Sequence, residues 1–485
     1  MESSPRTTHI VIVSVPAFSH QVSILEFAKR LLHLQANTFH VTCIIPTLSS
    51  SPSTSKPFFF QSLPQNIRCI FLPSVNFQDL DNNGVSVEVQ LQLSVSRAMP
   101  SVRENLISLS NTTEITALIA DAMFPEALEF GKKLNILSYV YFPCSIMTLS
   151  IFFHSQNLDE EVSCEYKDHP GLLQIPGCIS IRGIDLPDSV QDRGSLAYKL
   201  FLQRSKQYLN AHDGILVNSF MEMEEEATKA ISQHGHGDCH YPPVYSIGPI
   251  TQSGSSGSKS GCECLLWLDK QKPNSVTYVS FGSGGTLSQE QINELALGLE
   301  LSKHKFLWAN FRAPNDKTSA TYFSSDGCLV DDPLHFLPLG FLERTKGQGL
   351  VMCEWAPQVE VLGHKAIGAF LSHCGWNSIL ESVVHGVPMI AWPLFAEQRT
   401  NAALVTDGLK VALRPNVTSG NGVMVKKEEV VKLIKALMEG LEGEEIRRKV
   451  KEVKKFANCA MMEDGSSTRT ISKLAQKWKS LGKSF

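Results

Sequence analysis

Long apolar runs are absent from this sequence, and so is a strong charge of either sign. No segment is long and uncharged enough to cross a bilayer, and residues 1–8, ahead of the first apolar stretch, contain no hydrophobic leader. The net charge is only -4 over 485 residues, which leaves no basic field to attract nucleic acid. We therefore predict a cytoplasmic protein that has no membrane span and no nucleic-acid partner.

The common metal-binding and dinucleotide-binding motifs are also missing. The 12 cysteines are scattered, and the only close pair, Cys262 and Cys264, fits neither a zinc knuckle nor a thioredoxin-type site. The turn after the first apolar segment is Pro-Ala-Phe-Ser-His at 16–20, and the glycines within 282–285 have the wrong spacing for a Gly-x-Gly-x-x-Gly loop. These absences favour reduced thiols and argue against a dinucleotide-dependent oxidoreductase.

Short β-branched segments alternate with longer helical patterns along the whole chain, which is typical of βα units that form a parallel sheet buried on both faces. The strand candidates are residues 9–15, 39–46, 115–121, 138–143 and 214–220 in the first half, and 276–283, 306–311, 349–355, 367–372 and 388–394 in the second. A chain of 485 residues is too long for one ordinary core. We predict an α/β protein of two Rossmann-like, doubly wound domains facing across a cleft.

A linker-like composition separates the two halves. Residues 251–261 are Thr-Gln-Ser-Gly-Ser-Ser-Gly-Ser-Lys-Ser-Gly, which is typical of a flexible connection. This places an N-terminal domain at residues 1–250 and a C-terminal domain at 262–463. Residues 464–485 have the pattern of a helix with a narrow apolar face, which we expect to pack back on the N-terminal domain of a monomer instead of lying on a membrane surface. The polar segment 313–338 is typical of a long loop.

Polar and aromatic residues are densest between Trp355 and Gln398. In the middle of this stretch a predicted strand is followed by His373-Cys-Gly and then by a helix that Asn377 and Ser378 open. A helix start offers unpaired N–H groups and the positive end of the helix dipole, so it can hold a diphosphate, with both side chains as further donors. Asn-Ser ahead of an apolar helix can also be a simple helix cap. The crowding of aromatic, amide and acidic groups favours function.

A histidine and an aspartate are the candidate catalytic pair of the first half. His20 follows the first predicted strand, where ligands bind in such sheets, and we expect Ser19 to cap the helix 21–32. The helix dipole disfavours an imidazolium at a helix start, so His20 should stay neutral and able to accept a proton. Asp121 ends another strand, and its carboxylate could fix the far ring nitrogen of His20. A strand-end aspartate is often only a turn former, and the sequence alone does not bring the two together.

The stretch from Trp355 to Gln398 resembles the plant secondary product glycosyltransferase signature of the family 1 UDP-glycosyltransferases, from its first Trp to its last Gln. The resemblance extends over essentially the whole chain. Residues 264–287 are similar to the start of the family's C-terminal domain, and residues 337–344 are similar to its segment upstream of the signature. Phe-Gly-Ser-Gly-Gly-Thr-Leu-Ser at 281–288 is similar to the hydroquinone, monolignol and flavonoid glucosyltransferase branch.

This resemblance implies a GT-B architecture in which the C-terminal domain binds a UDP-sugar donor and the N-terminal domain binds a small aromatic acceptor. It also implies that His20 is the general base and Asp121 its partner. The donor-binding residues that it implies are Trp355 and Gln358 for uracil, Glu381 for the ribose, Ser283, His373, Asn377 and Ser378 for the diphosphate, and Trp376, Glu397 and Gln398 for the sugar.

The segment around the candidate base departs from the family pattern. The family has Gly-His-x-x-Pro, whereas this chain has Ser19-His20-Gln-Val-Ser23. The added side chain beside the base and the loss of a rigid helix start predict an unusually shaped acceptor pocket near His20. Trp308-Ala-Asn-Phe-Arg312 also differs from the commoner Trp-Val-x-Arg. Four aromatic side chains are expected to contact the acceptor: Phe18, Phe124, Phe142 and Phe395.

Together these features predict an inverting O-glucosyltransferase that moves glucose from UDP-glucose to a hydroxyl of a flavonoid, hydroquinone or phenylpropanoid type of phenol. A phenol has a pKa near the tyrosine value of about 10, close enough to a neutral histidine for one imidazole to serve as base. No Asp-x-Asp motif occurs near the signature. We therefore expect no cofactor and no metal, because the helix dipole together with His373 would balance the charge of the leaving diphosphate.

Two residues favour glucose as the transferred sugar. Glu397 and Gln398 can together recognise equatorial hydroxyls on one edge of the ring, and family members with His at the last signature position resemble galactose users. Arg399 lies just outside the signature, so no arginine within it would pair with a glucuronic acid carboxylate. A non-catalytic sugar-nucleotide binding protein is the alternative; it would keep the donor residues but have no use for His20 with Asp121.

Overall fold

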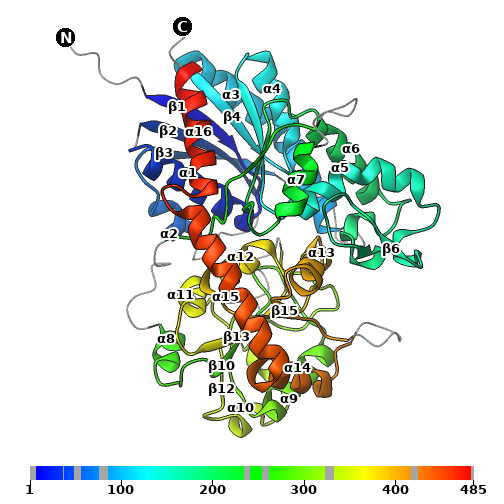
Figure 1. Cartoon of the computed structure of the whole chain (residues 1–485). Coiled ribbons are helices and arrows are strands. Elements are labelled where there is room, and N and C mark those ends of the chain that lie inside the picture. Colours follow the sequence, from blue (N-terminus) through cyan, green and yellow to red (C-terminus); the bar gives the residue numbers. More distant parts are fainter. Residues whose placement is uncertain are drawn as a thin grey trace. The chain divides into compact units, whose positions relative to one another are not determined.

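The structure of the protein, a computed structural model, describes residues 7–36, 38–48, 56–75, 86–233, 241–253, 262–322, 332–416 and 424–481. The chain divides into two compact units, each with its own parallel sheet (Figure 1). Unit 1 consists of Met1–Ser253 and Ala457–Phe485, and unit 2 consists of Gly254–Phe456. The second division therefore falls within α15 (Leu441–Met461), whereas the sequence suggested a boundary after residue 463. From residue 254 on, the linker expected at 251–261 lies outside the described residues.

The sheet of unit 1 has seven strands in the order β3-β2-β1-β4-β5-β8-β9, and every neighbouring pair is parallel. The central strands are almost entirely buried because helices cover both faces of the sheet, which explains their continuous apolar sequences. The strands are β1 (Thr8–Val13), β2 (Phe39–Leu48), β3 (Ile67–Val75), β4 (Ile115–Asp121), β5 (Leu137–Phe142), β8 (Ile215–Val217) and β9 (Val244–Ser246).

Serine side chains begin three helices of unit 1. Ser86, Ser145 and Ser195 each accept a hydrogen bond from the backbone N–H three residues later, which satisfies a donor that the helix leaves unpaired. The helices are α1 (Phe18–Leu34), α2 (Lys56–Gln61), α3 (Val87–Thr112), α4 (Leu128–Lys133), α5 (Ile146–Glu161), α6 (Leu196–Leu209), α7 (Glu225–Gln233) and α16 (Ser466–Leu481). A short hairpin, β6 (Leu172–Leu173) with β7 (Ile181–Arg182), and the short helices η2 (Pro125–Ala127), η3 (Tyr166–Asp168), η4 (Gly183–Asp185) and η5 (Asp188–Val190) complete the unit.

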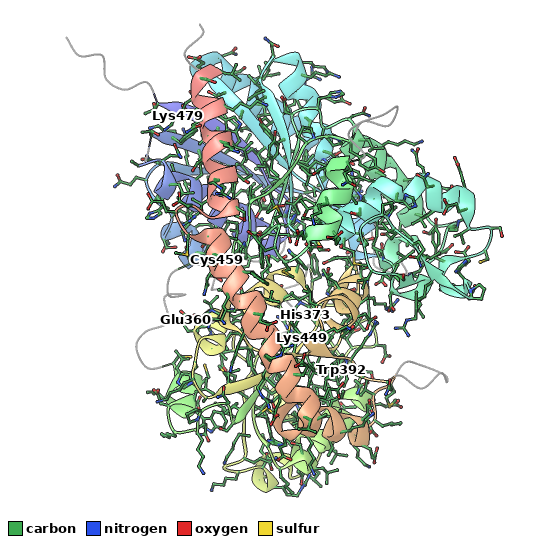
Figure 2. All side chains as sticks on the ribbon, in the orientation of Figure 1. Glu360, His373, Trp392, Lys449, Cys459 and Lys479 are labelled. Carbon is green, nitrogen blue, oxygen red and sulfur yellow. The ribbon has the colours of Figure 1, made fainter. Side chains whose placement is uncertain are left out.

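The C-terminal helix α16 packs against α1, β4 and β9 of unit 1, and is drawn in red in Figure 1. Its Trp478 is fully buried, with ring centroids 6.3 Å from Phe39 and 5.6 Å from Tyr139. Lys479, labelled near the end of the helix in Figure 2, donates to Gln35 of the segment after α1 at 2.9 Å. The apolar face of α16 is thus covered by protein.

Unit 2 has a six-stranded parallel sheet in the order β12-β11-β10-β13-β14-β15. The strands are β10 (Val276–Ser280), β11 (Lys305–Trp308), β12 (Gly349–Val351), β13 (Ile367–Ser372), β14 (Met389–Ala391) and β15 (Ala412–Leu413). The helices are α8 (Glu263–Leu268), α9 (Gln289–Ser302), α10 (Phe341–Arg344), α11 (Gln358–Leu362), α12 (Trp376–His385), α13 (Gln398–Ala403), α14 (Lys427–Glu439) and α15, with the short η7 (Pro333–Phe336) and η8 (Leu404–Gly408).

The prediction of two doubly wound α/β halves is confirmed, and each of the ten predicted strands overlaps an observed one. The segment 313–338 is not loop throughout, because Pro333 and the residues after it form η7, which Asp332 caps through a hydrogen bond from the Leu334 N–H. Among the described residues, no helix combines the length and the apolar character needed to cross a membrane.

Candidate active site

The first turn of α1 carries His20. The helix begins at Phe18, and its N-cap is Ala17, which has no side-chain group to cap with. The prediction that Ser19 caps this helix is therefore wrong, since Ser19 already lies inside it. The backbone N–H of His20 donates to the carbonyl of Ala17 at 3.1 Å, so the imidazole is held within the first helical turn.

Asp121 meets the imidazole of His20. The carboxylate ends β4 and is fully buried, and its Oδ2 and Oδ1 lie 2.9 and 3.1 Å from Nδ1 of His20. Oδ1 also accepts the backbone N–H of Met123 at 2.9 Å, which fixes the orientation of the carboxylate. A carboxylate at Nδ1 favours the tautomer with the proton on Nδ1 and the lone pair on Nε2. The His20 side chain is 21% exposed, so a ligand can reach the ring.

The aromatic residues expected to contact an acceptor lie in different environments. Phe18 is half-buried and packs edge-on against Phe59 and Phe60 of α2, with centroid distances of 5.9 and 6.5 Å. Phe124 and Phe142 are enclosed in unit 1, being 0% and 3% exposed, which favours a core role for both rings in the ligand-free molecule. In unit 2, Phe395 is half-buried, and its ring is edge-on to Tyr322 at 5.9 Å. No pattern in the sequence indicated that the two α2 rings lie beside Phe18.

In unit 2, a turn of three residues joins β13 to α12. The strand ends at Ser372, and the helix N-cap is Gly375, with no side-chain hydrogen bond to the cap. The interpretation of Asn377 and Ser378 as helix caps is therefore wrong: both lie in the first turn of α12, after the cap. Both residues therefore lie at the positive end of the helix, where Oγ of Ser378 accepts a hydrogen bond from Gln358.

His373, labelled in Figure 2, lies in this turn, and its ring is close to Gly375 and Gly282. A Cβ atom at Gly375 would lie 2.4 Å from Nε2 of His373, and one at Gly282 would lie 2.6 Å from the same atom, so only glycine fits at either position. Burial lowers the pKa of His373 to about 4, while a hydrogen bond to the Ser280 backbone acts in the opposite direction. The imidazole is therefore neutral at pH 7. Our expectation that His373 balances diphosphate charge needs correction: in this state it can offer a hydrogen bond but no full positive charge.

Three of the expected donor residues form one hydrogen-bonded group. Nε2 of Gln358 donates to Oγ of Ser378 at 2.9 Å and to Oε2 of Glu381 at 2.7 Å, and Oε1 accepts from the Tyr278 hydroxyl at 3.3 Å. Burial raises the pKa of Glu381 to about 7, and the hydrogen bond from Gln358 limits this rise. The family resemblance implies that Gln358 binds uracil, Ser378 the diphosphate and Glu381 the ribose. In the structure, Gln358 contacts both of the other side chains.

Trp355 is unusual among the tryptophans of the chain because its side chain is largely accessible. It is 46% exposed, whereas Trp376 and Trp392 are 3% and 5% exposed. Trp355 immediately precedes the segment that leads into α11, where Gln358 is the first helical residue. An exposed indole three residues before Gln358 of this hydrogen-bonded group is a suitable surface for stacking an aromatic base.

Glu397 and Gln398 lie at the start of α13. Glu397 is the N-cap position, and its Oε1 accepts from Nδ2 of Asn401 at 3.2 Å. Oε1 of Gln398 accepts the backbone N–H groups of Leu394 and Phe395 at 2.8 and 3.1 Å. The oxygen of this amide is thus occupied by the loop before the helix. In this arrangement only the NH2 group of Gln398 is placed to contact a sugar, so the predicted recognition of sugar hydroxyls by Glu397 and Gln398 would use Gln398 as a donor alone.

The loop after β10 carries Ser283, three residues beyond the end of the strand at Ser280, so the predicted strand was too long. Gly282 has φ of +72°, a conformation that favours glycine. Nδ2 of Asn310 donates to the carbonyl of Gly282 at 2.5 Å, and Nη2 of Arg312 donates to the carbonyl of Ser283 at 3.0 Å. Asn310 itself has φ of +56°, which asparagine tolerates better than β-branched residues. This gives a physical account of the departure from Trp-Val-x-Arg: Asn310 holds the Ser283 loop.

Within the described residues, the cysteines and other metal-ligating side chains form no further centre. The ten cysteines within the described residues are free thiols, and the Sγ atoms of Cys262 and Cys264 are 3.2 Å apart. In the same part of the chain, no group of three or more His, Cys, Asp or Glu side chains is arranged to hold a metal ion.

Comparison with known proteins gives a consistent set of matches. The family model described as UDP-glucoronosyl and UDP-glucosyl transferase matches residues 253–435. The chain is 47% identical over 474 residues to a hydroquinone glucosyltransferase of Rauvolfia serpentina, with 98% of each chain covered. It is 44% identical over 482 residues to UDP-glycosyltransferase 72B1 of Arabidopsis thaliana, covering 99% of this chain and 98% of that one. The structure of Phytolacca americana UGT2 complexed with UDP-2fluoro-glucose and pterostilbene is similar with a TM-score of 0.86 and 40% identity, over 98% of this chain and 100% of that chain.

Proposed function

The chain belongs to the plant family 1 UDP-glycosyltransferases, with the GT-B fold of two Rossmann-like domains, and from this we propose that it is an inverting O-glucosyltransferase acting on small phenols. Unit 2 takes UDP-glucose and unit 1 takes the acceptor, with His20 as general base and Asp121 as its partner. The observation that carries the proposal is the contact of 2.9 Å between Nδ1 of His20 and the buried Asp121 carboxylate, because a protein that only bound sugar nucleotides would have no use for it.

The proposed reaction is a single displacement. Nε2 of His20 takes the proton of the acceptor hydroxyl as the oxygen attacks the anomeric carbon, and the bond from that carbon to the diphosphate oxygen breaks. Attack from the face opposite the leaving group inverts the configuration of the anomeric carbon. The Asp121 carboxylate accepts the Nδ1 hydrogen and stabilises the imidazolium that forms, in the manner of the carboxylate in a catalytic triad.

UDP leaves with more negative charge than it had in the donor. The first turn of α12 would supply backbone N–H groups and the positive end of the helix dipole, and Asn377 and Ser378 lie in that turn. His373 would add a hydrogen bond as a neutral ring, since its pKa is lowered to about 4. Charge stabilisation is thus assigned mainly to the oriented backbone of this turn and not to a cationic side chain.

A phenolic acceptor suits a single histidine base. A phenol has a pKa of about 10, so a neutral imidazole has only a few pKa units to overcome, whereas an aliphatic alcohol holds its proton far more tightly. The names of the matched relatives agree with this choice, since one is a hydroquinone glucosyltransferase and the Phytolacca enzyme was solved with pterostilbene. Both support a hydroxylated aromatic ring as the acceptor of this chain.

Release of UDP is the direct test. The purified full-length protein is incubated with UDP-glucose and hydroquinone, UDP is measured, and the product is identified by mass spectrometry and by the anomeric proton coupling in NMR. We expect a β-glucoside, formed with inversion from the α-linked donor, and equal amounts of UDP. UDP binding without turnover on any phenol would show a binding protein, and an α-glucoside would overturn the inverting mechanism.

A further inference from the structure

Three neighbouring strands of unit 1 direct a polar side chain from their carboxyl ends to the same helix, α1. Asp121 ends β4, Tyr141 lies opposite it in the register of β5, and Asn218 follows β8 directly. Asp121 contacts His20, whereas the other two contact Ser23, which lies almost one turn further along α1. The helix is therefore attached to the sheet at two successive points on one face.

Ser23, Tyr141 and Asn218 form one hydrogen-bonded group, called the Ser23 group below. The Tyr141 hydroxyl donates to the Ser23 carbonyl at 3.0 Å, and the Ser23 hydroxyl lies 2.7 Å from Oη of Tyr141, to which it can donate in turn. Nδ2 of Asn218 donates to Oγ of Ser23 at 3.2 Å and to the carbonyl of Ile250 at 3.0 Å, and its Oδ1 accepts the Ile250 N–H at 2.7 Å. With these assignments no hydrogen is used twice.

The Ser23 group is buried, so each of its hydrogen bonds depends on its protein partner. Ser23, Tyr141 and Asn218 are 2%, 0% and 0% exposed, so water cannot replace a partner that moves away. Loss of any one of these bonds leaves a buried polar group unpaired, which is costly in free energy. The pKa of Tyr141 is raised far above its usual value by burial, so the hydroxyl keeps its proton and remains a donor at every working pH.

Ser23 is also one of the two residues, with Ser19, at which the chain departs from the Gly-His-x-x-Pro pattern. Position 23 is the sixth residue of α1, and a proline there would stiffen the backbone through its ring alone, since it has neither a side-chain hydroxyl nor a backbone N–H. Serine lacks that stiffness, but here its hydroxyl and its carbonyl connect the helix to Tyr141 of the sheet. The second turn of α1, which follows the turn that carries His20, is thus held by side-chain hydrogen bonds in place of a ring.

We propose that Ser23, Tyr141 and Asn218 are positioning residues that hold the N-terminal part of α1, and with it the imidazole of His20, in the geometry needed for proton transfer. The proposal rests on the proposed role of His20 as the general base. Asp121 fixes the direction of the imidazole ring, and the Ser23 group fixes the helix from which the ring projects. A shift of α1 by a fraction of an ångström would move Nε2 away from the acceptor hydroxyl, and such misplacements strongly reduce catalysis.

The test uses phenols of different acidity with the full-length enzyme. For wild type, Tyr141→Phe and Ser23→Ala, kcat/KM is measured with UDP-glucose and a series of substituted phenols, from weakly acidic ones to nitrophenols. A misplaced general base lowers the transfer rate more for acceptors that must lose a proton in the reaction than for acceptors that are already ionised. We expect a loss of about tenfold or more for the weakest acids in both variants, a loss below about threefold for the nitrophenols, and an unchanged KM for UDP-glucose. Ser23→Thr, which keeps the hydroxyl, should recover most of the loss.

Tyr139→Phe is the matched control. Tyr139 lies two residues before Tyr141 on β5 and is equally buried, but its ring contacts Trp478 and Tyr245, whereas the Tyr141 hydroxyl bonds to Ser23. We expect this variant to change kcat/KM by the same factor for every phenol in the series. A loss of the same size for all phenols in Tyr141→Phe, or no loss at all, would overturn the positioning role, because lower stability alone reduces every rate equally. Full activity of His20→Ala would instead refute the base assignment itself, so the two failures are distinguishable.

Discussion

Nδ1 of His20 and Oδ2 of Asp121 are 2.9 Å apart although 101 residues separate them in the chain. The contact joins the first turn of α1 to the end of β4, and it forms because β1, the strand that α1 follows, pairs with β4 in the sheet. The catalytic proposal therefore depends on the topology of unit 1 and not on any local motif.

Replacing His20 by Ala should lower kcat by at least about two orders of magnitude, because no other group would then take the acceptor proton. The dissociation constant of UDP, measured by calorimetry, should stay within about twofold, since the donor residues belong to unit 2. A His20→Ala enzyme that kept most of its activity on an unactivated flavonoid would rule out this base. Asp121→Asn should also be severe, though less so with nitrophenols, because an amide orients the ring but does not stabilise its positive charge.

Trp355→Ala should weaken UDP binding. If the exposed indole stacks on uracil, its removal should cost about 1 to 3 kcal/mol of binding free energy, as for stacked bases elsewhere. Calorimetric titration with UDP measures this directly, and the relative rates with different phenols should not change. Trp355→Phe, which keeps a smaller stacking surface, is the control, and its affinity for UDP should lie between those of the wild type and Trp355→Ala. Unchanged UDP affinity in the Ala variant would remove Trp355 from the donor site.

The stability of the ligand-free protein should depend on the charge of Glu381. Its pKa is raised by burial from 4.5 to about 7, so the folded state favours the protonated carboxyl. Because the pKa of this carboxyl is higher in the folded than in the unfolded state, the group stabilises the folded protein fully when the pH is below the unfolded pKa. This stabilisation is lost as the pH rises towards 7. Relative to wild type, Glu381→Gln should therefore gain in unfolding free energy between about pH 4.5 and 7 and stay constant above that window. Urea unfolding of both proteins across this range is the measurement, and a pH-independent difference would contradict the shift.

Much of the fold could be predicted from local patterns in the sequence. β4 and β13 were found with their observed bounds because strands buried on both faces are short, continuous apolar runs. β3 was missed because it is an edge strand, with exposed residues along one side and a proline at position 73. β15, with two residues, is too short for any periodicity to show.

The candidate site was predictable only in part. The residues of the signature stretch could be located because they are close together in the sequence, but the bonds between Gln358, Ser378 and Glu381 could not. The Ser23 group was not predicted at all, since its bonds join residues 118 and 195 positions apart. Serine, tyrosine and asparagine are ordinary core and turn residues, so only the packed structure shows that they share hydrogen bonds.

Trp478→Ala should destabilise unit 1 strongly. The indole is fully buried between Phe39 and Tyr139, and replacing a buried aromatic side chain by alanine typically costs about 3 to 5 kcal/mol. Thermal or urea unfolding measures the loss. Leu481→Ala on the same helix is the control, because Leu481 is 41% exposed and its loss should cost less than about 0.5 kcal/mol. Equal effects of the two substitutions would show that α16 does not pack on the sheet through Trp478.

The donor should be UDP-glucose, and its selection should depend on Glu397 and Gln398. The oxygen of Gln398 is held by the N–H groups of Leu394 and Phe395, so its NH2 can only donate to a sugar oxygen, while the Glu397 carboxylate can only accept from sugar hydroxyls. Galactose inverts one hydroxyl and would leave one of these groups without its partner. Sites that recognise hydroxyls in this way discriminate strongly, because a buried polar group without a partner is costly.

The decisive measurement is kcat/KM for UDP-glucose, UDP-galactose, UDP-xylose and UDP-glucuronate with one phenol. We expect UDP-glucose to be preferred by at least about tenfold, which corresponds to about 1.4 kcal/mol of transition-state stabilisation. Gln398→His keeps an N–H donor but cannot accept both backbone N–H groups, so it should disturb the loop at 394–395 and reduce the preference for glucose. Gln398→Glu is the matched control: it keeps the oxygen that holds the loop but loses the NH2 group, and it should lower the rate with UDP-glucose without loosening the loop. Preference of the wild type for any other donor would overturn the assignment of glucose and leave the transferase class standing.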